Sequence, residues 1–225
     1  MRVAVTLCRP NLILYLAIII FGGAAAHNND YWATGGSTGV AYFGTGTAAT
    51  VSSTVTNCRA VAVQNGQLYF STGSGTTRGV YKVGTGMPVA SGTTSTNVIS
   101  MGSAASPFGF AFNAAGTICY VADDLTTAAG GIYKFTFNGT NWVQAYILGT
   151  GVANIGARGL CVDFSGSNPV IYATTAEATA NRLIKITDAG ASSTATTLAT
   201  AATNTIFRGL AFAPTILVLR PSLAA

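Results

Sequence analysis

Three arginines recur at one position of a repeated pattern, and guanidinium groups gathered in this way could bind an anion. Arg59, Arg158 and Arg208 each begin one of four short segments of alternating large and small residues, and these four segments start about fifty residues apart. If these segments line a channel, the three side chains lie near one mouth, where they could hold a carboxylate or sulfate bidentately. The alternative is that each arginine pairs with an aspartate or a loop carbonyl of its own or a neighbouring repeat.

Residues for catalysis or metal binding are scarce. The run Gly35–Gly39 matches a hydrolase nucleophile elbow, but an elbow needs a following helix and a later histidine, and the one histidine is His27. We therefore expect a turn between strands. A calcium site needs several oxygen ligands, and no third carboxylate lies near Asp123 and Asp124. We therefore expect these two residues to stabilise a turn. The sequence predicts no catalytic residue, no metal and no cofactor.

The four cysteines do not form a disulfide framework. Cys8 lies in the N-terminal segment, which leaves an odd number in the rest of the chain. Cys119 and Cys161 fall at apolar positions of the repeat, where cysteine packs as a small hydrophobe. Cys58 precedes a strand and is the one candidate for a free thiol.

The elements that must position these residues are short strands in a repeat. First strands of four units align at residues 59–63, 108–112, 158–162 and 208–212. A strand with large residues on one face and small residues on the other is packed on both, as it is between two neighbouring sheets. Second, third and fourth strands follow in each unit. The sequence thus predicts an all-β, β-propeller-like fold of about four blades, each with four antiparallel strands.

The two ends of the repeat region complement each other. Tyr31–Gly35 matches the second strand Tyr69–Gly73, so the repeats begin with a second strand, whereas they end with the first strand Arg208–Phe212. Together these two parts make one blade, as in a complete small ring closed by both termini. The other interpretation is a part of a larger propeller. We place the propeller at residues 27–214 and a C-terminal tail at 215–225.

Residues 1–26 have the parts of a secretory signal peptide. Arg2 and Arg9 are followed by the apolar run Leu12–Phe21 and by small residues that end at Ala26. The alternative, an uncleaved anchor, needs about twenty apolar residues, and this run is shorter. We expect a secreted, extracellular protein, or a periplasmic one in a bacterium, without membrane association after cleavage. The net charge of +5 is spread along the chain, so nucleic acid is not an expected partner.

One modification site stands out. Asn138-Gly139-Thr140 is both a predicted hairpin tip and an N-glycosylation sequon, so Asn138 is a candidate for a glycan in a eukaryotic host.

Two segments resemble a known group. Ala128–Lys134 and Thr196–Pro214 are similar to an uncharacterised family of secreted, propeller-like repeat proteins of bacteria and plants. The resemblance implies a secreted propeller, and the greater length of the family's members favours part of a larger ring. No catalytic or binding residues are established for the family, so it assigns none.

Two functions follow from these features. The first is a secreted, non-catalytic binding or structural module that presents loops to a glycan, a peptide or a protein. The alternative is a fragment of a propeller hydrolase, similar to lactonases, whose catalytic residues are not evident. The scarcity of histidine and acidic residues favours the first.

Overall fold

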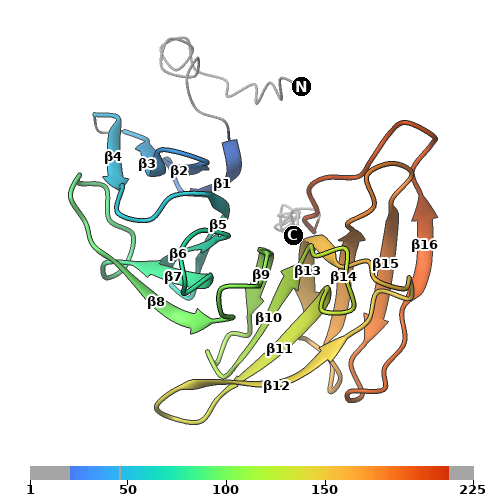
Figure 1. The fold of residues 1–225 in the computed structure, drawn as a ribbon. Coiled ribbons are helices and arrows are strands. Elements are labelled where there is room, and N and C mark those ends of the chain that lie inside the picture. Colours follow the sequence, from blue (N-terminus) through green and yellow to red (C-terminus); the bar gives the residue numbers. More distant parts are fainter. Residues whose placement is uncertain (1–20, 46, 213–225) are drawn as a thin grey trace, which may run out of the picture.

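The structure is a computed structural model that describes residues 21–45 and 47–212. The regular secondary structure in these residues consists of β-strands. Four antiparallel sheets of four strands form a four-bladed β-propeller (Figure 1). The first blade contains β1 (Phe21–His27), β2 (Asp30–Gly35), β3 (Gly39–Phe43) and β4 (Ala49–Ser52). The second contains β5 (Cys58–Gln64), β6 (Gln67–Thr72), β7 (Gly79–Val83) and β8 (Ser95–Ser100). The third contains β9 (Pro107–Phe112), β10 (Ile118–Asp123), β11 (Gly131–Phe137) and β12 (Trp142–Leu148). The fourth contains β13 (Ala157–Asp163), β14 (Val170–Thr175), β15 (Arg182–Thr187) and β16 (Thr196–Thr200).

The predicted fold is confirmed. Within each blade the strands are hydrogen-bonded in chain order, as a meander, because short turns connect them. The first strand of a blade is its inner strand, and β5, β9 and β13 contain three of the four aligned segments. Inner strands of successive blades pack against each other, β1 with β5, β5 with β9 and β9 with β13.

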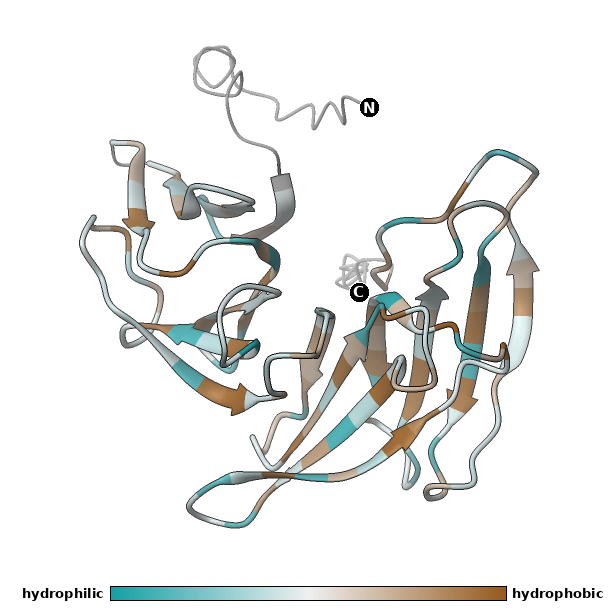
Figure 2. Cartoon of the chain, viewed as in Figure 1, coloured by the Kyte–Doolittle hydropathy of each residue, from teal (hydrophilic) through white to brown (hydrophobic). Residues whose placement is uncertain are grey.

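Most of the apolar core lies between blades, and one small cluster lies within the first blade. One cluster joins the first and second blades around Trp32 and Phe70, another joins the second and third around Val80 and Phe110. A third joins Tyr120 of the third blade to blade four. Apolar stretches accordingly run along the strands (Figure 2). Burial of each large side chain stabilises the fold by about 1.5–3 kcal/mol, so no blade is stable without its neighbour.

Small residues allow the inner strands to approach closely. A Cβ at Gly109 would lie 2.7 Å from the carbonyl oxygen of Arg158, and one at Gly159 would lie 2.9 Å from that of Arg208. The large residues of the same strands, such as Phe110 and Leu160, are buried. The alternation read from the sequence therefore fits both faces of each inner strand.

The structure does not show the closure by both termini, which was one of the two interpretations of the repeat ends. Residues 208–212 form no strand, and β1 takes the inner position of the first blade beside β2. An inner strand forms only where a second strand is free to exchange backbone hydrogen bonds with it, and β1 occupies that edge of β2. The segment 208–212 instead lies against β13.

The alignment of the first blade shifts by one residue. Trp32 pairs with Tyr42 across β2 and β3, as Tyr69 pairs with Lys82 in the second blade. Trp32, and not Tyr31, thus occupies the tyrosine position of the repeat. The sequence alignment missed this because the loop after β2 is shorter than the loop after β6.

Most of the predicted leader and the tail lie outside the described residues. These are residues 1–20 and 215–225, and cleavage next to Ala26 remains a prediction. Residues 21–26 of the leader belong to β1. In the described part of the chain, no helix is long and apolar enough to cross a membrane.

Candidate functional site

Two of the three repeated arginines come together at one end of the inner strands. Arg158 Nε donates to Asp124 Oδ2 at 2.8 Å, and Arg59 Nη1 lies 3.5 Å from Asp124 Oδ1. Arg59 also donates to the Ser106 hydroxyl at 2.7 Å. The Phe108 ring lies within 4.6 Å of the Arg59 guanidinium and 5.7 Å of the Arg158 guanidinium. The Asp124 carboxylate thus forms ion pairs with two guanidinium groups.

This geometry agrees with pairing to a neighbouring blade, the alternative stated for Arg59 and Arg158. Asp124 lies in the loop between β10 and β11 of the third blade, whereas the two arginines belong to the second and fourth blades. Arg208 is exposed, and no ion pair involving it occurs among the described residues. Binding of an anion by Arg59, Arg158 and Arg208 remains a prediction.

The acidic pair acts in a turn. Asp123 is buried and accepts hydrogen bonds from the backbone N–H groups of Ser106 and Leu125, at 2.8 and 3.0 Å. Burial raises the pKa of Asp123, although these two hydrogen bonds oppose the shift. The expectation of a turn-stabilising role is met for Asp123. No cluster of three metal-ligating side chains occurs in the described residues.

Asn138 lies in the exposed turn between β11 and β12, as predicted. Its Oδ1 accepts from the backbone N–H groups of Thr140 and Asn141, at 3.0 and 2.8 Å, and Gly139 has a positive φ of 95°. The site is accessible, and glycosylation of Asn138 remains a prediction. The elbow-like run Gly35–Gly39 is the turn between β2 and β3.

The prediction for Cys58 is wrong in one respect. All three described cysteines are free, so Cys58 is not distinguished by a free thiol. Cys58 lies within β5, where burial raises the pKa of its thiol to about 12. Cys119 is buried at an apolar position, as expected, and Cys161 is partly buried. Deeply buried, protonated thiols are poor nucleophiles.

The structure also contains a polar cluster that the sequence did not reveal. Asp188 follows β15 of the fourth blade and has a side chain with 0% exposure. It accepts hydrogen bonds from the Tyr120 hydroxyl, from Lys134 Nζ at 2.8 Å and from the Tyr146 hydroxyl at 2.7 Å. These three donors belong to β10, β11 and β12, so the cluster fastens the third blade to the fourth.

Charge and hydrogen bonding set the ionisation of this cluster. Burial alone would raise the pKa of Asp188, but hydrogen bonds from Lys134, Tyr120 and Tyr146 outweigh it, and the pKa falls below its ordinary value. Burial works against the charged form of Lys134 as well, and its bonds to Asp188 and Tyr146 raise its pKa nonetheless. Asp188 and Lys134 therefore form a charged pair at neutral pH.

A depression of about 540 Å³ opens above this pair. Lys134, Tyr146 and Asp188 lie at its floor, and loops of the third and fourth blades form its walls. Most wall residues have small or amide side chains, and the others are Ile118, Phe164 and Pro169. The depression thus offers hydrogen-bonding groups beside two aromatic rings.

Only part of this site leaves a trace in the sequence. Lys134 and Tyr120 stand in repeat columns that carry lysine and tyrosine in other blades, which the sequence shows. Asp188 has no counterpart in those columns, and it lies 54 residues from Lys134 along the chain. Nothing local connects them, because the packing of two blades brings them together.

Comparison of the chain with models of protein families and with curated proteins finds no match. The resemblance to secreted repeat proteins therefore remains a prediction.

Proposed function

We propose that the chain is an exported, non-catalytic propeller module that binds a neutral glycan in the depression between its third and fourth blades. The observation that carries this proposal is the ammonium group of Lys134 at the floor. An ammonium has three N–H donors, and Lys134 uses two of them on Tyr146 and Asp188. Within the described residues the third donor has no partner, and it is available to a ligand oxygen.

The charge balance of the site favours a neutral ligand. Lys134 is compensated by Asp188 at 2.8 Å, so the floor carries no net charge. An anionic ligand would meet the carboxylate, and a cationic one the ammonium. Sugar hydroxyl groups both donate and accept hydrogen bonds, which suits an ammonium donor next to the Tyr146 hydroxyl.

The walls support the same ligand class. The rings of Phe164 and Tyr146 provide apolar faces for C–H groups, and the amides of Asn113 and Asn168 both donate and accept hydrogen bonds. A volume of about 540 Å³ is within the range of small-molecule sites. Among a glycan, a peptide and a protein, a short oligosaccharide therefore fits best.

The test is binding to an array of neutral and acidic oligosaccharides. We expect binding to neutral oligosaccharides, and a folded Lys134→Met variant that binds at least tenfold more weakly, since a hydrogen bond from a charged group contributes about 1.5–3 kcal/mol. The control is Lys82→Met, because Lys82 stands in the same repeat column as Lys134 but does not line the depression.

Some outcomes would contradict the proposal. Absence of binding to every neutral oligosaccharide would reject the glycan, and selective binding of unmodified peptides would replace it with a peptide ligand. Equal weakening by Lys134→Met and Lys82→Met would place the site elsewhere on the molecule.

A further inference from the structure

Two segments of the chain could occupy the same position in the propeller, the inner strand of the first blade. In a ring of four blades, the inner strand after β13 is the inner strand of the first blade. The strand β1 holds that position by pairing with β2. The segment 208–212 has the sequence of an inner strand, and it returns from β16 to lie beside β13, on the side facing the first blade (Figure 1).

The contacts of this segment are those of an inner strand toward the preceding blade. The Thr174 hydroxyl lies 3.5 Å from the carbonyl oxygen of Arg208, as the Thr34 hydroxyl lies 2.8 Å from that of Arg59. The Phe212 ring packs edge-on against Tyr172 at 5.9 Å.

The corresponding residues of blades two and three also bring two aromatic rings into contact. Tyr69 and Phe112 occupy the columns of Tyr172 and Phe212, and their ring centroids are 4.7 Å apart. Gly159 lies close to the Arg208 carbonyl oxygen, as Gly109 lies close to the Arg158 carbonyl oxygen. The segment 208–212 is therefore docked on the fourth blade but lacks a second strand.

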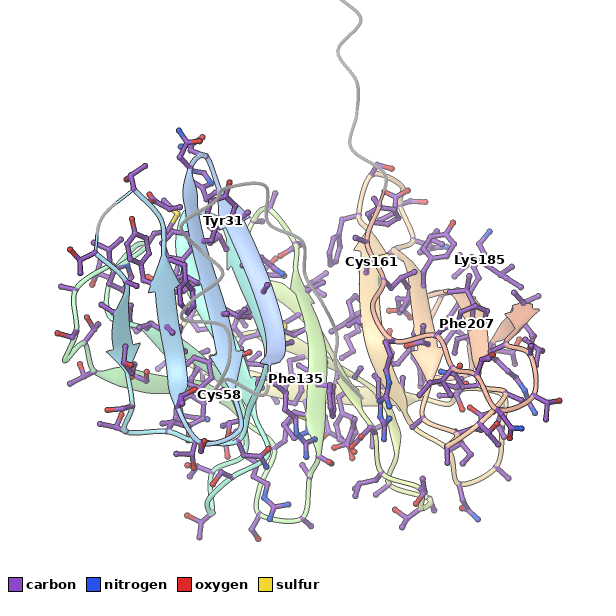
Figure 3. The ribbon with its side chains drawn as sticks, turned by 90° about the horizontal axis from the view of Figure 1, so that it is seen from above. Tyr31, Cys58, Phe135, Cys161, Lys185 and Phe207 are labelled. Carbon is purple, nitrogen blue, oxygen red and sulfur yellow. The ribbon has the colours of Figure 1, made fainter. Side chains whose placement is uncertain are left out.

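One apolar residue of this segment and the residue before it remain exposed. Phe212 is 53% exposed and Phe207 is 36% exposed, and both stand among the few large apolar side chains at the surface of the described residues. Figure 3 shows Phe207 beside the fourth blade and Tyr31 on the first, with the other blades between them in that view.

The present occupant fits its position poorly. Ala24 of β1 stands in the column of Val61, Phe110 and Leu160, which are buried, whereas Ala24 is exposed. Leu210 belongs to this column and would bury more apolar surface there than alanine does.

We propose that the segment Arg208–Phe212 replaces β1 as the inner strand of the first blade once residues 1–26 are removed. Leu210 then pairs with Ala33 and Ala211 with Trp32, the register that Leu160 and Cys161 have with the second strand of their own blade. Both termini thereby close the ring, and the chain folds into its final form only after processing. The inference rests on the proposed export, so its test uses a chain made to begin at His27 and needs no cellular cleavage.

Backbone hydrogen exchange tests the pairing directly. In the chain that begins at His27, we expect slow exchange of the amides of residues 208–212 and retained protection of β2. In the full chain of residues 1–225, the same amides should exchange fast, because β1 holds the edge of β2.

A glycine variant provides a second and independent measurement. Gly209 has no atom within 4 Å of a Cβ in the full chain, whereas Gly23, whose place it would take, has the Arg59 carbonyl oxygen at 2.9 Å. Gly209→Val should therefore lower the urea midpoint of the shortened chain by about 0.5–1 M and leave that of the full chain unchanged. Gly159→Val is the matched control and should lower both midpoints.

Three results would overturn the proposal. Fast exchange at 208–212 in the shortened chain, or a shortened chain that does not fold, would overturn it, since β2 would then have no inner partner. Slow exchange accompanied by dimers in light scattering would also overturn it, because the second strand would come from another copy. None of these results bears on glycan binding at Lys134, which is measured separately.

Discussion

Replacement of Asp188 by asparagine should destabilise the propeller more than any other change of one carboxylate. The side chain of Asp188 has 0% exposure, and that of Lys134 has 15%. Asp188→Asn keeps the shape but leaves the ammonium without its counter-ion. It also points amide hydrogens at groups that are themselves donors. Removing one partner of a buried pair costs about 3–5 kcal/mol, and we take the lower figure because Lys134 touches solvent.

Urea unfolding measures this change. With a slope of about 2 kcal/mol per M, a loss of about 3 kcal/mol lowers the midpoint by about 1.5 M at neutral pH. The matched control is Asp163→Asn, an exposed carboxylate at the end of β13 that accepts hydrogen bonds from Ser165, one of them from its backbone N–H at 2.9 Å. A variant of Asp188 that unfolds at the same urea concentration as that control would refute the reasoning.

Acid should abolish the difference between the Asp188 variant and the parent. Because the pKa of Asp188 in the folded state lies below its ordinary value of 3.8, the ionised carboxylate contributes stability above that pH. The contribution is lost as the pH falls through the folded pKa. The two unfolding free energies should therefore differ by a constant amount near neutral pH and converge below pH 3.8. A difference that persists unchanged in strong acid would show that shape, rather than charge, is responsible.

Two further predictions concern export and modification of the chain. A fusion of residues 1–27 to a reporter should be secreted and cleaved next to Ala26, which N-terminal sequencing would show; an uncleaved fusion held in the membrane would identify an anchor instead. In a eukaryotic host, the exposed Asn138 should carry a glycan, so treatment with a glycosidase should lower the mass of the secreted product, and Asn138→Gln should abolish that shift. An unchanged mass for the parent protein would contradict this assignment.

The sequence by itself determined the blade. Alternation of large and small residues is a property of one strand, so Phe108–Phe112 and Arg158–Val162 can be recognised as inner strands without knowledge of their partners. Turn residues such as Asn138 and Gly139 act within a few positions of the chain, and they fixed the hairpin of the third blade. Local rules were therefore sufficient for most strands, for this turn and for the number of units, but not for β1 or for residues 208–212, which form no strand.

Only the tertiary structure decided which side chains meet between blades. Arg59 and Arg158 share Asp124, and Lys134 reaches Asp188, through packing of sheets that are far apart in the sequence. The occupant of the first blade's inner position is also a tertiary choice, since residues 21–27 and 208–212 can both be strands and one edge of β2 accepts a single partner. The strand pattern specifies which residues can pair, whereas the competition for a shared edge depends on every other contact that the two segments make.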